Sequence, residues 1–150
     1  RLRYLSLSAA GFGGRIPNNL GNLTNLHFLD LSWNIFSPES NINWISQLPL
    51  LEQLDMSYLS FLFQANNLPV ISAPKLQFLN LAFNGLTVSI LDALQNTTSL
   101  VHLDLQGNNL SSSIPSSSGN LKKLEYLDLS QCWLLGPIPN ASKMQLPLNY

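Results

Sequence analysis

The sequence predicts an α/β solenoid, a coiled chain with a parallel β-sheet on its concave face. Short 3-10, helical or extended segments would form its convex face. Two observations lead to this prediction. Leucine supplies 33 of the 150 residues, while charged residues make up only 10% of them. A leucine pattern also recurs every 24 or 25 residues, and such a period is typical of stacked repeat arrays. With 45% hydrophobic residues, the chain belongs among folded rather than disordered sequences.

The repeating unit begins with the pattern Leu-x-x-Leu-x-Leu. The only departure in the six full copies is Met56, which replaces the third leucine of its copy. We expect one domain over residues 1–150, containing six full repeats and the start of a seventh at Leu148. The six full repeats begin at Leu2, Leu26, Leu51, Leu76, Leu100 and Leu124. Solenoids normally carry polar caps at both ends. Neither end has one here, so we expect a fragment of a longer chain.

Each copy contains one predicted strand. Apolar and polar residues alternate there, as in Leu29-Asp30-Leu31, and alternation with period two indicates a half-buried strand. Strands that recur at this spacing are expected to be parallel, because each connection is long enough for the crossover that parallel strands need. The leucines of each turn would then be buried against those of its neighbours.

The connecting segments differ between repeats. In the first repeat, Ile16-Pro17 predicts a short extended piece and then a helical or 3-10 turn, which proline is suited to open. Gly21 would suit the exit of that turn, with a positive φ. The step recurs at Ile114-Pro115, with Gly119 in the exit position, and at Ile138-Pro139. The third and fourth repeats lack it, so their turns near residues 61–63 and 88–90 should have another outer geometry.

An asparagine follows three of the predicted strands, at Asn34, Asn84 and Asn108. An inward-facing carboxamide can bond backbone groups of successive turns and satisfy amides that a tight bend leaves unpaired. The equivalent positions of the other repeats hold Ala10, Leu59 and Cys132. The thiol of Cys132 is a weak donor that can serve in the same place. As the one cysteine, it cannot form an internal disulfide. A redox or metal-binding role is the less favoured alternative.

The segments 14–23, 26–34 and 100–121 together carry a familiar pattern. They resemble the plant-type leucine-rich repeat, which continues with Leu-x-Gly-x-Ile-Pro and a Leu-Gly-Asn-Leu segment. With Trp44-Ile45 and Leu48-Pro49 in the irregular second turn, the chain looks most like the outer segment of a plant receptor-like protein or receptor-like kinase.

This resemblance implies a right-handed superhelix on the extracellular side of the plasma membrane, or a protein secreted to the apoplast. Its concave face would bind a peptide, a glycan or a co-receptor kinase. The resemblance also implies a membrane anchor in the parent chain and no cofactor.

Four rows of side chains are predicted to face the concave side, because alternate strand residues point away from the leucines. An aromatic row ends the strands, and a second row with aromatic rings begins them. An exposed apolar patch with a polar rim often marks a binding surface. The alternative is that the rings stack along the sheet and only stabilise it. The candidate ligand-binding residues are Trp33, Tyr58, Phe83, Phe28, Phe78, His102, Tyr126, Asp30 and Asp55.

The aspartates of a further row are predicted to lie side by side, Asp30 next to Asp55 and Asp104 next to Asp128. Neighbouring like charges destabilise a sheet, so some compensation is expected. A cationic group of the ligand or a bound ion could supply it. Aspartate between two leucines is, however, also common in the family that the chain resembles.

Composition and motifs argue against several other functions. The net charge is −1 and the pI about 6.1, so a nucleic-acid partner is not expected. No apolar run approaches the roughly 20 residues that a membrane helix needs, and no metal-ligand cluster is visible. His102, Asp104 and Ser130 are compatible in spacing with a catalytic triad, but nothing indicates a positioned base or an oxyanion hole. We expect no enzyme activity.

Four N-glycosylation sequons begin at Asn22, Asn96, Asn109 and Asn140, which is consistent with secretion. Two alternatives to a receptor remain at this point. A secreted protein similar to polygalacturonase inhibitors would bind a cell-wall enzyme. A structural or ice-interacting array would use a regular polar face, and the serine runs at 111–113 and 116–118 weakly favour it.

Overall fold

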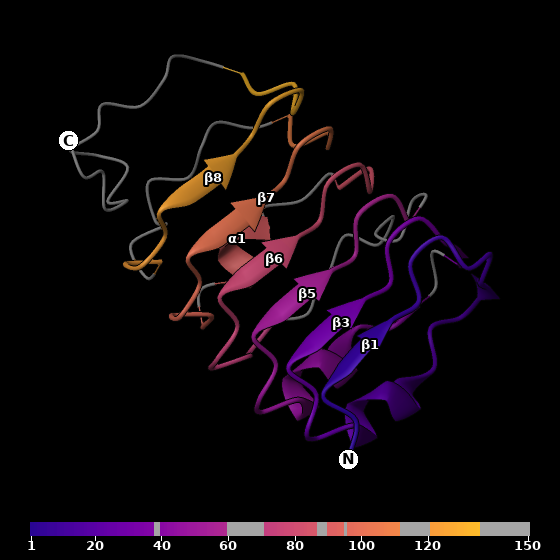
Figure 1. The fold of residues 1–150 in the computed structure, drawn as a ribbon. Helices are drawn as coiled ribbons and strands as arrows, with labels where there is room; N and C mark the ends of the chain where they lie inside the picture. The colour runs from indigo at the N-terminus through magenta and orange to yellow at the C-terminus, as the bar shows by residue number, and fades with distance from the viewer. Residues whose placement is uncertain (38–39, 60–70, 87–89, 95, 112–120, 136–150) are drawn as a thin grey trace.

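The computed structural model is a solenoid with one long parallel sheet (Figure 1). It describes residues 1–37, 40–59, 71–86, 90–94, 96–111 and 121–135. The six strands lie side by side in chain order, as predicted for a repeat of this length. They are β1 (Tyr4–Ser6), β3 (Phe28–Asp30), β5 (Gln53–Asp55), β6 (Phe78–Asn80), β7 (His102–Asp104) and β8 (Tyr126–Asp128).

The strand register aligns equivalent residues of successive repeats. Leu5 pairs with Leu29, and Leu29 with Leu54, in parallel ladders that continue to β8. Residues on either side of these leucines therefore form straight rows across the sheet, as the repeat alignment predicted. One row holds Tyr4, Phe28, Gln53, Phe78, His102 and Tyr126, and the other holds Ser6, Asp30, Asp55, Asn80, Asp104 and Asp128.

The convex side carries short helices. These are the 3-10 helices η1 (Asn18–Asn22) and η2 (Asn43–Gln47) and the four-residue α-helix α1 (Ile90–Ala93). Pro17 immediately precedes η1 and accepts a hydrogen bond from the Leu20 N–H at 3.1 Å, which confirms the predicted turn after Ile16-Pro17. The fourth repeat has an α-helix from Ile90 onward, and residues 87–89, which hold most of its predicted irregular turn, lie outside the described residues. The predicted turns at 61–63, 114–119 and 138–139, and the serines at 112–118, lie outside the described residues.

Gly21 corrects the prediction of a helix exit with positive φ. It lies inside η1, and its φ is not positive. A Cβ at this position would overlap the side chain of Gln47, which belongs to η2. The absent side chain of Gly21 thus leaves room for the end of the Gln47 side chain between two 3-10 helices of successive turns.

A second, two-stranded sheet extends the turn between the concave and convex sides. Its strands β2 (Gly13–Gly14) and β4 (Ile35–Phe36) are parallel, with Gly13 opposite Ile35. The extended piece predicted at Ile16-Pro17 follows this sheet, and Pro17 has the extended backbone expected there, with φ −71° and ψ 129°. Gly14 has a φ of 72°, a conformation that favours glycine.

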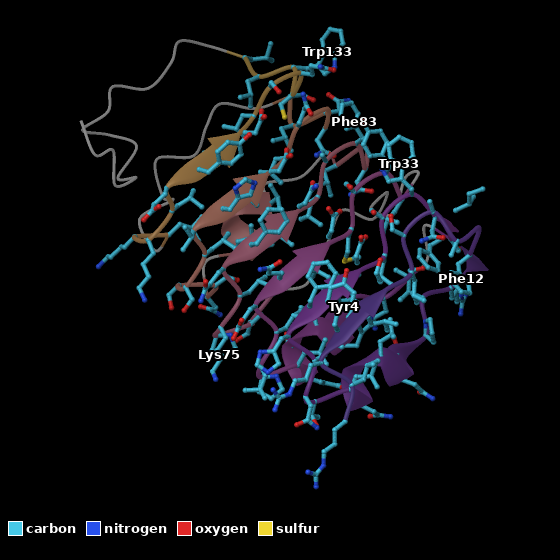
Figure 2. All side chains as sticks on the ribbon, in the orientation of Figure 1. Tyr4, Phe12, Trp33, Lys75, Phe83 and Trp133 are labelled. Atoms are coloured by element: carbon cyan, nitrogen blue, oxygen red, sulfur yellow. The ribbon has the colours of Figure 1, made fainter. Side chains whose placement is uncertain are left out.

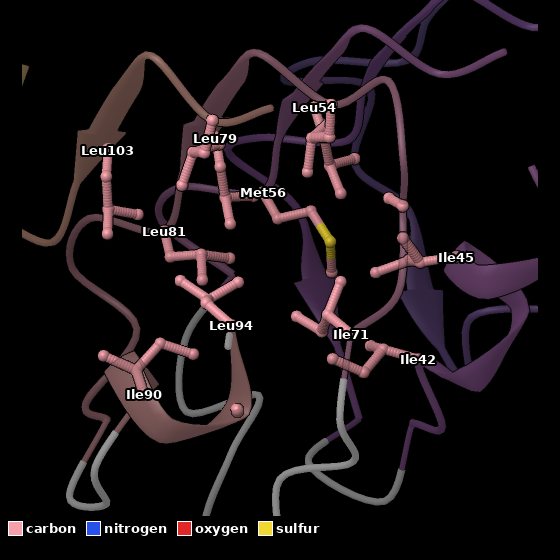
Figure 3. Close-up of a cluster of buried hydrophobic side chains, with 14 of the residues drawn as sticks. Ile42, Ile45, Leu54, Met56, Ile71, Leu79, Leu81, Ile90, Leu94 and Leu103 are labelled. Atoms are coloured by element: carbon pink, nitrogen blue, oxygen red, sulfur yellow. The ribbon is translucent and has the colours of Figure 1, made fainter. Parts of the chain in front are cut away.

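The core lies between the long sheet and the convex segments. Figure 3 shows Leu54, Met56 and Leu79 directed towards Ile71 and Leu94, and all five side chains are almost completely buried. The leucines of β1 and β8, in contrast, are only partly buried. The central leucine of a strand is thus fully buried only where that strand has a neighbouring strand on each side. Within the described ranges, no helix is long and apolar enough to cross a bilayer.

The asparagines that follow the strands bond the backbone of two turns. Asn34 Nδ2 donates to the carbonyls of Leu7 at 2.9 Å and Leu31 at 2.8 Å, while its Oδ1 accepts the Phe12 N–H. Asn84 and Asn108 make equivalent bonds. In the last repeat the Cys132 thiol donates to the Leu105 carbonyl at 3.0 Å. The predicted structural role of this position is confirmed.

Candidate ligand-binding face

The aspartate row caps the strand ends. Asp30 Oδ1 accepts the backbone N–H of Ser32 at 2.9 Å and the hydroxyl of the same serine at 2.7 Å. Four further members of the row make the same backbone bond, in the pairs Asp55–Ser57, Asn80–Ala82, Asp104–Gln106 and Asp128–Ser130. Ser6, at the start of the row, donates its hydroxyl to Asp30 Oδ2 at 3.5 Å instead. A side-chain oxygen that accepts the N–H two residues later stabilises a bend of this kind.

These bonds supply compensation that the sequence suggested a ligand or ion could provide. Asp55 Oδ2 also accepts the Asn80 amide at 3.0 Å, so the central aspartate has donors on both oxygens. At the end of the row, hydrogen bonds from Ser130 lower the pKa of Asp128. Aspartate and asparagine both fit because each offers an acceptor oxygen to the backbone.

The bend after each cap contains a residue with a left-handed backbone. Trp33, Tyr58 and Phe83 have φ values of 57°, 55° and 56°, and Gly107 has 69°. Such values are uncommon for bulky residues. The same conformation at Ala9 and Gln131 shows that this bend forms with small and polar side chains as well.

The position of Trp33, Tyr58 and Phe83 corrects one detail of the prediction. The strands end three residues earlier, at the capping row, so these side chains lie along the carboxyl-terminal edge of the sheet. Figure 2 shows Trp33 and Phe83 at that edge, whereas Tyr4 lies over the strands. The aromatic row therefore borders the concave face instead of lying in its middle.

We call Trp33, Tyr58 and Phe83 the edge ladder, because their rings stack. Trp33 and Tyr58 have ring centroids 4.0 Å apart, and Tyr58 and Phe83 4.5 Å, with interplanar angles of 14° and 18°. Trp33 is still 59% exposed. The rings thus stabilise one another and leave apolar surface available to a ligand.

A second set of rings stacks over the strands themselves. The ring centroids of Tyr4 and Phe28 are 4.2 Å apart. The His102 ring lies between those of Phe78 and Tyr126, with centroid distances of 4.4 Å and 4.0 Å. Gln53 separates the two stacks in the strand register. We call these five rings the face row.

The face row changes how His102 is interpreted. Its imidazole packs flat between two rings, and Asp104 and Asp128 use one oxygen each to cap a bend. The backbone N–H of Ser130 donates to Asp128. These contacts give the three possible triad members structural partners. Among the residues that the structure describes, no group of three His, Cys, Asp or Glu side chains is placed to hold a metal ion.

The concave rows are acidic. Their residues include four aspartates and no lysine or arginine. Partial burial and the nearby Asp128 and Asp104 raise the pKa of the Tyr126 hydroxyl, which donates to Asp128 Oδ2 at 3.3 Å. A partner with positive charge complements this surface.

The edge ladder is followed by a pocket that sequence reasoning missed. It has a volume of about 380 Å³ and is lined by Phe83, Gly107, Gln131 and Trp133. Trp133 is 78% exposed and, like Phe83, lies at the carboxyl-terminal edge (Figure 2). The sequence signal that could have indicated this pocket is Gly107, which interrupts the aromatic row, followed in the next repeat by Trp133.

Three of the four sequon asparagines fall on described, exposed positions. Asn22 ends η1, Asn96 follows α1, and Asn109 follows the bend after β7. Each has the exposure that a glycan requires. Asn140 lies outside the described residues.

Comparison with known families now adds to this geometry. Two family models described as leucine-rich repeats match residues 1–23 and 74–134, together more than half of the chain. The chain is a leucine-rich repeat protein. The capped strands and asparagine positions are thus features of a leucine-rich repeat array, in agreement with the predicted fold.

The relatives of this leucine-rich repeat protein include plant receptors. It is 42% identical over 89 residues to receptor-like protein EIX1 of Solanum lycopersicum, a stretch that covers 58% of this chain and 8% of the relative. The chain therefore spans only a small part of that relative's length.

Solved structures of plant receptors match most of the chain. The Arabidopsis receptor kinase HAESA, in complex with the peptide hormone IDA and the co-receptor SERK1, has 31% identity and a TM-score of 0.61. That match covers 97% of this chain and 29% of HAESA. A TDR receptor has 25% identity and a TM-score of 0.71, with 85% of this chain and 22% of that receptor covered. The leucine-rich repeats of this protein thus resemble plant receptor ectodomains.

Proposed function

We propose that this chain is an extracellular recognition module, part of the ectodomain of a plant receptor-like protein or receptor-like kinase. It binds a peptide ligand or a co-receptor on its concave face and the carboxyl-terminal edge of that face. The observation that carries the proposal is the stacked, partly exposed edge ladder next to an acidic surface. Aromatic side chains supply much of the binding energy at protein interfaces.

The similarity to receptors of known complexes supports this function. HAESA is known in complex with the hormone IDA and with SERK1, and another matched receptor kinase ectodomain is in complex with CASPARIAN STRIP INTEGRITY FACTOR 2. The matched relatives reported above are receptors, which favours a receptor over the polygalacturonase-inhibitor alternative.

The proposed location is the extracellular side of the plasma membrane, with the anchor in the parent chain. The exposed sequon asparagines Asn22, Asn96 and Asn109 support it, because N-glycans are added to accessible sites in the secretory pathway. Analysis of a plant-expressed sample by mass spectrometry tests this location. Unmodified asparagine at all three positions would contradict it.

The binding proposal is tested by titrating the chain with IDA, CASPARIAN STRIP INTEGRITY FACTOR 2 and the SERK1 ectodomain, using biolayer interferometry. We expect saturable binding of at least one of these probes. The triple variant Trp33→Ala, Tyr58→Ala and Phe83→Ala should weaken that binding by about tenfold or more, since hot-spot aromatics each contribute about 2 kcal/mol or more.

A matched control is the double variant Phe12→Ala and Ile35→Ala, which removes exposed apolar side chains from outside the edge ladder. It should bind as the natural chain does. Circular dichroism establishes that all variants remain folded. Equal affinity of the folded triple variant and the natural chain would overturn the assignment of the ladder, and failure of all three probes would count against the proposed ligand class.

A further inference from the structure

The edge ladder ends at a residue without a side chain. Each ring from Trp33 to Phe83 stacks on the next at 4.0–4.5 Å, but the following position in the row is Gly107. A Cβ on Gly107 would overlap the Phe83 ring, which means that this ring lies directly over the glycine backbone. Phe83 therefore stacks on a neighbouring ring on the Tyr58 side and on no ring at Gly107.

The pocket described above occupies the space next to this break. Phe83 and Trp133 form aromatic parts of its wall, and Gly107 and Gln131 complete it. Its volume of about 380 Å³ is near the lower end of the roughly 300–1,000 Å³ typical of ligand pockets. This space is large enough for one large side chain.

The lining favours an aromatic group over a polar one. The Gly107 N–H already donates to the Ser130 carbonyl at 2.9 Å, so the glycine offers no free donor. The Gln131 amide provides one donor and acceptor group, which can orient a polar atom such as an indole N–H. Two aromatic walls provide the offset or edge-to-face contacts that aromatic groups prefer.

The charge nearby indicates the rest of the ligand. Asp104 and Asp128 stand opposite each other on β7 and β8, the two strands that lead into the pocket residues. No lysine or arginine occupies the concave rows of these repeats. A basic residue close in sequence to the aromatic one would therefore complement this part of the face.

We propose that this pocket is a specificity subsite that takes an aromatic side chain of a peptide ligand, packed against Phe83 and Trp133, with a neighbouring basic residue near Asp104 and Asp128. The inference rests on the proposed function in one respect, that the ligand is a peptide. It adds the chemical class of the side chain that the receptor selects.

The test uses tripeptides as probes, acetyl-Lys-Trp-Lys-amide and acetyl-Lys-Leu-Lys-amide, titrated into the isotope-labelled chain and followed by NMR. The tryptophan probe should shift the Gly107 and Gln131 amides and the Trp133 indole N–H. We expect it to bind about three- to tenfold more tightly than the leucine probe, which is the contribution of an aromatic pair. Acetyl-Glu-Trp-Glu-amide should bind more weakly than the lysine analogue.

Trp133→Ala is the central variant, because its exposed side chain can be removed without disturbing the core. It should lower affinity for the tryptophan probe to that for the leucine probe. Ile35→Ala is the matched control: Ile35 holds the equivalent repeat position four turns earlier and is 72% exposed. Gly107→Ala serves as a second variant that obstructs the pocket, although its φ of +69° makes Trp133→Ala the safer readout.

Equal affinity for the tryptophan and leucine probes would overturn the subsite, as would unchanged binding to folded Trp133→Ala. Equal affinity for the lysine and glutamate probes would overturn the basic neighbour. The single variant Trp33→Ala, which keeps the Tyr58 ring that stacks on Phe83, separates this inference from the proposed function. It should weaken binding of a hormone or co-receptor and leave tripeptide affinity unchanged.

Discussion

At the scale of single residues, the position after each strand shows how one slot accepts different chemistry. Asn34, Asn84 and Asn108 bond carbonyls of two successive turns, and Cys132 makes one such bond with its thiol. Leu59 and Ala10 occupy the slot without a polar side chain. Next to Leu59, the Oδ1 of Asn84 in the following turn accepts the Leu59 N–H at 2.9 Å. An asparagine is thus not required in every turn.

Cys132 gives a prediction about alkaline stability. Burial raises the pKa of its thiol above the ordinary value, so the unfolded chain releases this proton at a lower pH than the folded chain. The thiol's contribution to the free energy of unfolding is complete at pH values below its pKa in the unfolded chain. That contribution is lost as the pH rises through its pKa in the folded chain. We expect the free energy of unfolding to fall more steeply between pH 8 and 10 than in Cys132→Ser.

Urea denaturation at several pH values measures this difference, and comparison of the two chains cancels the contribution of Tyr126. The native thiol should also react slowly with iodoacetamide at pH 8, since the thiolate is the reactive form. Parallel stability curves for the natural chain and the serine variant would contradict the assignment.

At the scale of elements, the capped bend is the unit that repeats most faithfully. Asp55 accepts the Ser57 N–H and hydroxyl, at 2.9 and 2.7 Å, and the Asn80 amide at 3.0 Å. The acceptor oxygen, more than the charge, holds the bend, because Asn80 makes the equivalent backbone bond at 3.0 Å.

We therefore expect Asp55→Ala to lower the free energy of unfolding by about 1–2 kcal/mol, the loss of hydrogen bonds at a half-buried site. Asp55→Asn keeps the acceptor and should cost less than half as much. Urea denaturation at neutral pH provides both values. If Asp55→Asn were as destabilising as Asp55→Ala, the stabilising property of Asp55 would be its charge and not its capping hydrogen bond.

The same elements show where sequence reasoning reaches its limit. Period and alternation predicted the parallel strands and their register, because each leucine has one possible side to face. They did not show that the strand ends before Trp33, since the bend depends on a cap formed by another residue. The close approach of Gly21 to Gln47 and the pocket at Gly107 also depend on contacts between turns, which spacing along one chain does not contain.

At the scale of the whole molecule, stability depends on having neighbours. Leu79 lies in β6, between β5 and β7, and is fully buried, whereas Leu5 lies in β1 and is half-buried. In a solenoid each repeat contacts only the adjacent ones. Equivalent leucines in different repeats therefore contribute different amounts to the free energy of unfolding.

We expect Leu79→Ala to lower the free energy of unfolding by about 2–5 kcal/mol, the usual range for a buried leucine. Leu5→Ala should cost less than half of this, since water already reaches its side chain. Chemical denaturation of both variants checks the ratio. Equal losses of stability in the two variants would contradict this prediction, because they would show that the core is as well packed at β1 as at β6.

The left-handed residue in each bend has a consequence for diversity. Alanine, tryptophan, tyrosine, phenylalanine, glycine and glutamine all occupy this conformation, at Ala9, Trp33, Tyr58, Phe83, Gly107 and Gln131. Since the bend forms with six such different residues, the side chain displayed there is interchangeable. A single nucleotide change can thus alter the surface offered to a partner while the scaffold stays intact. The edge of the sheet works as a set of display positions, one for each turn.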